Sequence, residues 1–177
     1  MPKTYLFVDE ANLYLAARKK GWQIDWIRFL SHLRTAFDID KAYLYEGSPT
    51  KVSIRVGNKF ATDNEIAGQK KSKNRYFGKL RTGGYTIRHK PVSTVAGKNK
   101  CNFDVEITVD AIDTLDSYDV CVLATGDGDF IRLVKYLRGK GKDVHIVGPK
   151  KSNKELKREA RGNFQTISGM RSHIERS

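Results

Sequence analysis

Short apolar runs alternate with helical patterns along most of this chain. The sequence predicts strands at residues 5–8, 42–45, 85–90, 119–124, 143–147 and 164–167. Helical patterns lie between most of them: after Asp25, near 60–81, from about Asn102, at 129–139 and after Ser152-Asn153. No hairpin turn of the Asn-Gly kind joins two strands. The alternation predicts an α/β fold with three α/β/α layers around a mainly parallel sheet.

The chain length predicts one domain of ordinary size, since 177 residues are enough to bury a substantial core. No internal repeat or low-complexity segment divides the sequence. We expect a single domain over residues 1–168 and a short C-terminal tail over 169–177.

The charge balance is strongly basic. Lys and Arg number 33 against 20 Asp and Glu, which gives a net charge of +13. Such a field favours a phosphate-rich partner, either nucleic acid or an anionic membrane surface. No run approaches the ~18 apolar residues of a membrane span, so we expect no membrane insertion and favour nucleic acid.

The cysteines and histidines indicate the redox environment of the protein and the kinds of metal site that it can form. The two cysteines, Cys101 and Cys121, form no CxxC pair, and a reducing, cytoplasmic location is the natural inference. The first ten residues contain Asp9 and Glu10 and carry no secretory signal pattern. Four scattered histidines provide no ligand set for structural zinc.

Acidic residues stand at the ends of two predicted strands. Asp127 and Asp129 follow the apolar run 119–124, and Asp9 follows the first strand. Asp104 lies in the first turn of a helix that follows another strand, which places it at the same edge of the sheet. Carboxylates this close disfavour one another's ionisation unless a cation neutralises them. Oxygen ligands without nearby His or Cys select Mg²⁺ or Mn²⁺.

The helix that begins near Asn102 has a predicted orientation. Val105, Val109 and Ile112 share one face, which we expect to pack on the core. Asp110 then falls on the opposite, solvated face together with Glu106 and Asp113.

Four segments, in order, resemble the motifs of NYN domains, a branch of the PIN-like nucleases that includes LabA-like proteins. They are FVDEANL (7–13), NFDV with VDA (102–105, 109–111), LATGDGDF (123–130) and LRGKGKDV (137–144). The resemblance covers residues 4 to about 148 and is weakest between 50 and 95. It implies a PIN-like, Rossmann-like fold and an endonuclease that depends on Mg²⁺ or Mn²⁺ and usually acts on RNA.

The resemblance also implies roles for individual residues. Asp9, Asp104 and Asp127 would be catalytic metal ligands, and Asp129 would complete the cluster or hold a metal-bound water. Asn12 would orient Asp9 or a substrate phosphate, and Thr125 would hydrogen-bond a neighbouring carboxylate. Two further positions are exceptional. Asp110 also matches the motif and is a weaker candidate for the site, with a structural role. Glu10 stands where a small residue is common, so it would either add a metal ligand or crowd the site. Asn102-Phe103 also departs from the glycine that often precedes the middle Asp.

Each carboxylate also has a structural interpretation. Asp127 suits the N-cap of the following helix, and Asp129 suits the cap of a helix that begins at Phe130. Asp104 would then be a favourable first-turn charge. A cap explains Asp127 but does not explain Asp9, so we favour the metal site for the set.

Basic residues form three groups that suit a polyanion. Lys98 and Lys100 precede Asp104 and are the preferred phosphate contacts. Lys70, Lys71, Lys73 and Arg75 alternate with Tyr76 and Phe77, a pattern that suits single-stranded nucleic acid, although it also describes a solvated helix face. A further cluster forms a general polyanion surface: Lys150, Lys151, Lys154, Lys157 and Arg158.

Three hypotheses follow. The first is an endoribonuclease in which a metal-activated water attacks the phosphodiester. The second is a non-catalytic nucleic-acid-binding or regulatory module with the same fold. The third is a phosphatase of the haloacid dehalogenase kind, which the sequence disfavours because Asp9-Glu10-Ala11 lacks the second Asp of that nucleophile motif. RNA is preferred over DNA as the partner, and a homodimer is one way to place nucleic acid across the acidic edge.

Overall fold

Six parallel strands form the central sheet of the molecule, in the order β10-β9-β8-β1-β2-β5. We describe a computed structural model that covers residues 2–50, 55–56, 59–60, 62–95 and 98–177. The strands are β1 (Thr4–Asp9), β2 (Ile39–Ser48), β5 (Tyr85–Pro91), β8 (Val120–Ala124), β9 (Asp143–Gly148) and β10 (Phe164–Thr166). The predicted α/β fold is confirmed, and every pairing within this sheet is parallel.

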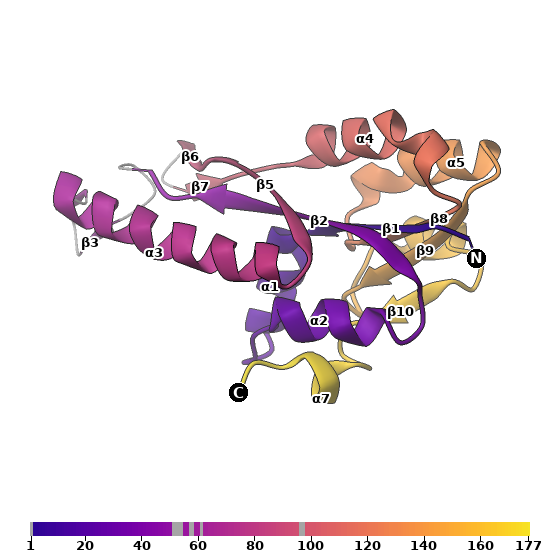
Figure 1. The fold of residues 1–177 in the computed structure, drawn as a ribbon, viewed down its shortest axis with the longest axis horizontal. Coiled ribbons are helices and arrows are strands. Elements are labelled where there is room, and N and C mark those ends of the chain that lie inside the picture. The colour runs from indigo at the N-terminus through magenta and orange to yellow at the C-terminus, as the bar shows by residue number, and fades with distance from the viewer. Residues whose placement is uncertain (1, 51–54, 57–58, 61, 96–97) are drawn as a thin grey trace.

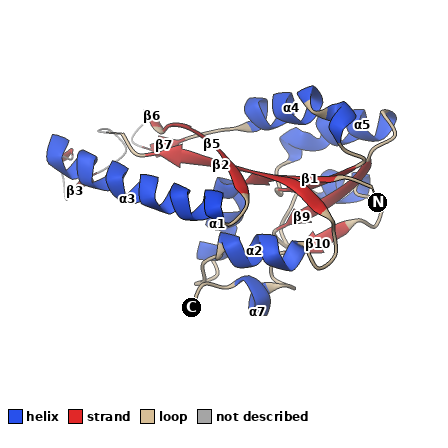
Figure 2. Cartoon of the chain, viewed as in Figure 1, coloured by secondary structure: helices blue, strands red, loops and turns tan. Residues whose placement is uncertain are grey.

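Helices cover both faces of the sheet, which gives the three layers seen in Figures 1 and 2. One face carries α1 (Glu10–Arg18), α2 (Trp26–Leu33), α3 (Asp63–Thr82) and α7 (Arg171–Ile174). The other carries α4 (Asp104–Asp113), α5 (Ile131–Gly139) and α6 (Lys154–Glu159). Two 3₁₀ turns, η1 (Leu115–Ser117) and η2 (Gly128–Phe130), precede β8 and α5.

Side-chain alternation along the buried strands divides the core in two. In β1, Leu6 and Val8 pack toward α1, α2 and α3, whereas Tyr5 and Phe7 pack toward α4 and α5. In β2, Tyr43 and Tyr45 join the α4 side. Because successive side chains of a strand point to opposite faces, this pattern determines which layer each polar residue at a strand end meets.

Local sequence signals account for the helix starts. The side chain of Asp25 accepts hydrogen bonds from the backbone N–H groups of Ile27 and Arg28, which confirms the predicted cap of α2. Thr62 and Glu65 form a reciprocal capping box at the start of α3. Asn153 caps α6. Side chains therefore satisfy backbone donors that the first turns leave free.

The prediction for the packing side of α4 is wrong. Val105 is 72% exposed, and Val109 and Ile112 are also exposed. Ile107 and Ala111 are buried instead, together with Phe103 just before the helix. These three residues recur at intervals of four and form the second apolar stripe of the same segment.

Two further differences concern segments with weak patterns. Part of the expected loop 93–101 forms an antiparallel pair, β6 (Ser93–Val95) with β7 (Lys98–Lys100). Another short pair, β3 (Arg55–Val56) with β4 (Lys59–Phe60), precedes α3.

At the C-terminus, α7 packs against α2 with Met170 and Ile174 buried. In the described part of the chain, no helix is long and apolar enough to cross a bilayer.

Candidate active site

The carboxyl ends of β8, β1 and β2 meet at one edge of the sheet. From β1 the chain builds β2 and β5 on one side, and it then returns to add β8, β9 and β10 on the other. The order therefore reverses between β1 and β8. In open α/β sheets, this switch point is where ligands bind, beyond the carboxyl ends of the strands.

Asp9 ends β1 and is the central carboxylate of this edge. Its Oδ2 accepts a hydrogen bond of 2.9 Å from Thr125 Oγ1, which comes from the end of β8. Its Oδ1 accepts a longer one, 3.4 Å, from the backbone N–H of Asn12. Asp9 is therefore the N-cap of α1, and the expectation that a cap does not explain Asp9 is wrong. Thr125 is fully buried, so its hydroxyl is a fixed donor rather than a solvated one. The structure thus places Asp9 and Thr125 together.

The loop after β8 holds Asp127 near Asp9, and Asp129 follows in η2. Asp127 Oδ1 accepts a hydrogen bond from the backbone N–H of Asp129, and the N–H of Asp127 donates to Thr125 Oγ1. Asp127 therefore caps the short turn η2. The expected alternative for Asp129 is wrong, because Phe130 occupies the cap position of α5 and no side chain caps that helix.

Asn12 ties α1 to the same loop. Its side-chain oxygen accepts a hydrogen bond of 2.9 Å from the backbone N–H of Gly126. This contact joins the first turn of α1 to the segment that carries Asp127. Asn12 thereby positions the loop through its side chain and contacts Asp9 through its backbone.

The glycines of this loop are required by close packing. A Cβ atom at Gly126 would lie 2.5 Å from Ser152 Oγ and 2.8 Å from Pro149 Cδ. A Cβ atom at Gly128 would lie 2.5 Å from Asn153 Nδ2. The segment between β9 and α6 therefore presses directly on the Asp127 loop.

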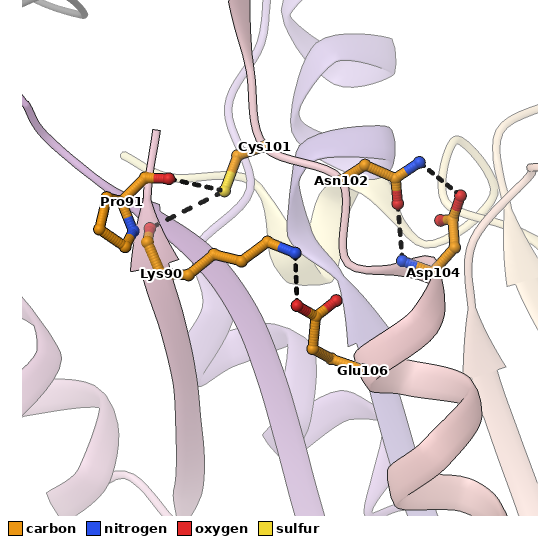
Figure 3. Close-up of polar contacts among 6 residues, drawn as sticks. All are labelled: Lys90, Pro91, Cys101, Asn102, Asp104 and Glu106. Atoms are coloured by element: carbon orange, nitrogen blue, oxygen red, sulfur yellow. Dashed lines mark hydrogen bonds and ion pairs between the residues drawn. The ribbon is translucent and has the colours of Figure 1, made fainter. Parts of the chain in front are cut away.

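Asp104 enters the site from the start of α4, with Asn102 as its neighbour. Asn102 Nδ2 donates to Asp104 Oδ2, and Asn102 Oδ1 accepts from the backbone N–H of Asp104, as Figure 3 shows. Asn102 therefore orients the Asp104 carboxylate through two hydrogen bonds. Lys90 pairs with Glu106, which lies in the same first turn of α4 as Asp104.

The carboxylates influence one another electrostatically. Burial raises the pKa of Asp9 to about 6, with a smaller contribution from the charges of Asp104 and Asp127, while hydrogen bonds from Thr125 and Asn12 oppose the shift. Burial also raises the pKa of Asp104, to which Asp127 and Asp129 add repulsion while Asn102 opposes it. Asp9, Asp104, Asp127 and Asp129 therefore share one electrostatic neighbourhood.

The donor set suits a hard divalent cation in its chemistry. It consists of carboxylate oxygens whose mutual repulsion a cation relieves. In the residues that the structure describes, however, no group of three or more His, Cys, Asp or Glu side chains is arranged to hold a metal ion. Coordination of one ion by several of these side chains would require them to rotate toward one another.

A second acidic pair faces the opposite layer. Glu46 follows Tyr45 in β2 and so turns toward α3, where Lys73 forms an ion pair with it. Burial and the charge of Glu46 together raise the pKa of Glu10 to about 8, although the positive charge of Lys73 opposes the shift. The sequence reasoning missed Glu46, although its place at a strand end, just before Gly47-Ser48-Pro49, was the available signal.

Glu10 and Glu46 lie in a groove with a volume of about 820 Å³. Side chains of α1 form one wall, and side chains of α3 form the other. Of the basic residues predicted to contact nucleic acid, Lys73 and Arg75 line this groove. Lys70 and Lys71 are exposed on α3 but do not line it. Tyr76 lines the groove, and Phe77 is buried in the core.

The other two predicted phosphate contacts, Lys98 and Lys100, lie in β7. They form the ends of this strand. Their side chains lie outside the described residues.

Asp110 is not brought to the acidic edge. It lies further along α4, where it accepts a hydrogen bond of 2.7 Å from Tyr45 Oη and forms a two-pronged ion pair with Arg88. Its side chain is only 19% exposed, so the expectation of a solvated face is wrong. The exposed stripe of Val105 and Val109 means that α4 is rotated, and this rotation turns Asp110 toward the sheet.

Comparisons with known proteins agree with this architecture. The model of the NYN domain family matches residues 3–168. "Low amplitude and bright protein LabA" of Synechococcus elongatus is 26% identical over an alignment that covers 97% of this chain and 87% of that protein. A crystal structure of a protein of unknown function from Vibrio parahaemolyticus matches with a TM-score of 0.71 and 25% identity, covering 94% of this chain and 93% of that one. Because the family model spans nearly the whole sequence, the chain belongs to the NYN domain family, within the PIN-like nucleases.

Proposed function

We propose that this protein is a metal-dependent endonuclease that cleaves RNA at the carboxyl edge of its sheet. The observation that carries the proposal is the convergence of Asp9, Asp104 and Asp127 from three separate segments on the switch point of a parallel sheet. Membership of a nuclease family supports the reaction class.

Mg²⁺ or Mn²⁺ is the proposed cofactor, held by Asp9, Asp104 and Asp127. A divalent ion bound there would lower the pKa of a coordinated water and neutralise charge that develops on the phosphate. Thr125 keeps Asp9 available as a carboxylate, because its hydrogen bond opposes the rise of the Asp9 pKa that burial causes. Asp127 Oδ1 is fixed by the backbone of Asp129, which limits how far the carboxylate can turn.

Charge supports a nucleic-acid substrate. The net charge of +13 attracts phosphates. The acidic edge is locally negative, so a phosphate would bind there together with a cation. Lys73 and Arg75 line the groove that opens beside Glu10, the residue next to Asp9. Free Cys101 and buried, free Cys121 support a reducing cytoplasmic setting.

The substitution Asp127→Asn tests the proposal. We expect wild-type protein to cleave RNA with Mn²⁺, and the variant to lose at least about 100-fold in rate, since several kcal/mol of charge stabilisation are removed. RNA binding at matched salt should change little. Asp116→Asn, at an exposed position in η1, is the matched control. Equal cleavage by the Asp127 variant and wild type would contradict the catalytic role.

A nucleic-acid-binding module without activity is the second candidate. It is favoured by one observation, that among the described residues no group of three or more His, Cys, Asp or Glu side chains is arranged to hold a metal ion. Wild-type protein that binds RNA in a salt-sensitive manner, yet cleaves no RNA or DNA with Mg²⁺ or Mn²⁺, would support this candidate over the nuclease.

A further inference from the structure

The groove between α1 and α3 has three chemically different sides. Its α1 wall presents Ala11, Tyr14 and the exposed Leu15. Its α3 wall presents polar and basic side chains, among them Lys73 and Arg75. Glu10, the first residue of α1, and Glu46, near the end of β2, also line it. An apolar wall, a cationic wall and a hydrogen-bonding floor are what an unpaired nucleotide requires for its base face, its phosphate and its base edge.

Glu46 has an unmet hydrogen-bonding capacity at this floor. The residue is only 7% exposed, and its Oε1 is held by Lys73. Its other oxygen, Oε2, is shielded from solvent and has no hydrogen-bond partner among the described residues. Buried carboxylate oxygens are normally satisfied, so this atom points to a missing donor. Lys73 is partly exposed and extends from the α3 wall, so rotation of its long side chain opens Glu46 to the groove.

The hydrogen-bond donors and acceptors of the groove floor match some nucleic-acid bases better than others. Glu10 and Glu46 offer two acceptors, because a carboxyl oxygen accepts in either protonation state, and Lys73 offers a donor. The Watson–Crick edge of guanine carries two donor groups, N1–H and the 2-amino group, beside the acceptor O6. Adenine and cytosine each have one donor group on this edge, and uracil has one donor between two acceptors.

We propose that this groove binds an unpaired guanine nucleotide, with the guanine edge on Glu10, Glu46 and Lys73 and the base face against Tyr14. The inference rests on the proposed function in one respect, that the strand so held would continue past Asp9 to be cleaved. The site would give the nuclease a preference for guanine at a fixed position near the cut.

Nucleotide binding to the full-length protein in EDTA tests the pocket without any cleavage. Isothermal titration calorimetry measures the affinity for the 5′-monophosphates of guanosine, adenosine, cytidine and uridine. Because all four share the ribose and the phosphate, differences in affinity report on the base. We expect guanosine monophosphate to bind about tenfold more tightly than the other three, the effect of one to two additional hydrogen bonds. Equal affinities for all four would overturn the proposal.

Inosine monophosphate provides a test on the unmodified protein, since inosine differs from guanosine only by the missing 2-amino group. It should bind about fivefold more weakly than guanosine monophosphate, the loss of one hydrogen bond. In Glu46→Gln the preference for guanine should fall below about threefold, whereas the α6 control Glu155→Gln should retain it. If inosine binds as well as guanosine, the two-acceptor floor is refuted, whatever the folding of the Glu46 variant.

The nuclease and the pocket can fail independently. Guanine-selective binding without any cleavage by wild type would leave the pocket and remove the proposed function. Cleavage of a random RNA pool with no base enriched near the cut, together with unselective nucleotide binding, would remove the pocket and leave the nuclease.

Discussion

Thr125 Oγ1 donates a hydrogen bond of 2.9 Å to Asp9 Oδ2, linking the end of β8 to the end of β1 across the switch point of the sheet. The same Oγ1 accepts from the backbone N–H of Asp127. One buried hydroxyl thus stabilises the ionised form of Asp9 and fixes the loop that carries the neighbouring carboxylate. The effect opposes burial, which raises the pKa of Asp9 to about 6.

Replacement of Thr125 by Val should move the pH dependence of cleavage. Val has a similar shape but no hydroxyl, so Asp9 loses a donor and its pKa rises further. We expect the acid limb of the pH–rate profile to shift upward by about half to one unit. Thr125→Ser keeps the hydroxyl and should retain the wild-type limb. An unchanged limb in the Val variant would mean that ionisation of Asp9 does not limit the rate.

Asp9 should also make stability depend on pH when divalent ions are removed. Its folded-state pKa, about 6, lies above the ordinary value of 3.8, so the folded protein binds the proton more tightly. The free energy of unfolding should therefore fall as pH rises from 4 through 6, by up to about 3 kcal/mol from this group. Asp9→Asn should lack this loss and exceed wild type in stability at pH 8 in EDTA, as measured by urea denaturation. A constant difference between the two proteins from pH 4 to 8 would refute the assignment.

Substitutions of Asp104 and Asp110, both in α4, should differ in their effects. Asp104→Asn should reduce cleavage by about 100-fold or more with a small effect on stability, since it removes a proposed ligand. Asp110→Asn weakens the contacts with Arg88 and Tyr45, so we expect a loss of about 1 kcal/mol in unfolding free energy, limited by the exposure of Arg88. Its cleavage rate should stay within about twofold of wild type. The opposite outcome, an inactive but stable Asp110 variant, would place Asp110 in the chemistry.

Close packing on the Asp127 loop predicts a cost for any side chain at position 126. Gly126→Ala places a methyl group against Ser152 and Pro149, and we expect a loss of about 1–3 kcal/mol in unfolding free energy. A Cβ atom at Gly139, the last residue of α5, would meet no other atom within 4 Å, and the φ angle of Gly139 is not positive. Gly139→Ala should therefore be neutral or slightly stabilising. Thermal denaturation of both variants measures the difference, and equal melting temperatures would contradict the packing argument.

The sequence was sufficient to predict the six strands of the central sheet and the acidic edge, because both depend on local patterns. An apolar run followed by Asp9 or by Gly126-Asp127 marks a buried strand and its polar end without any tertiary information. The cap at Asp25 is equally local. These features agree with the structure because propensity and packing favour the same conformation there.

Local patterns could not predict which face of α4 is buried, nor the Glu46–Lys73 contact in the groove between α1 and α3. The segment 103–112 contains two apolar stripes, and only contact with Phe7 and Tyr45 decides that Ile107 and Ala111 are buried. Glu46 and Lys73 are 27 residues apart and meet through the packing of α3 on β2. The contact of Ser152 with Gly126 likewise depends on how two loops approach. Such contacts leave no periodic signal in the chain.

The central claim is that Asp9, Asp104 and Asp127 bind a divalent ion together. Anomalous scattering from a crystal of the protein soaked in Mn²⁺ tests it directly. The proposal predicts a peak about 2.1–2.3 Å from carboxylate oxygens of at least two of these residues, and its loss in Asp127→Asn. Ordered Asp9, Asp104 and Asp127 side chains with no anomalous peak between them, at a Mn²⁺ concentration that supports cleavage, would contradict it.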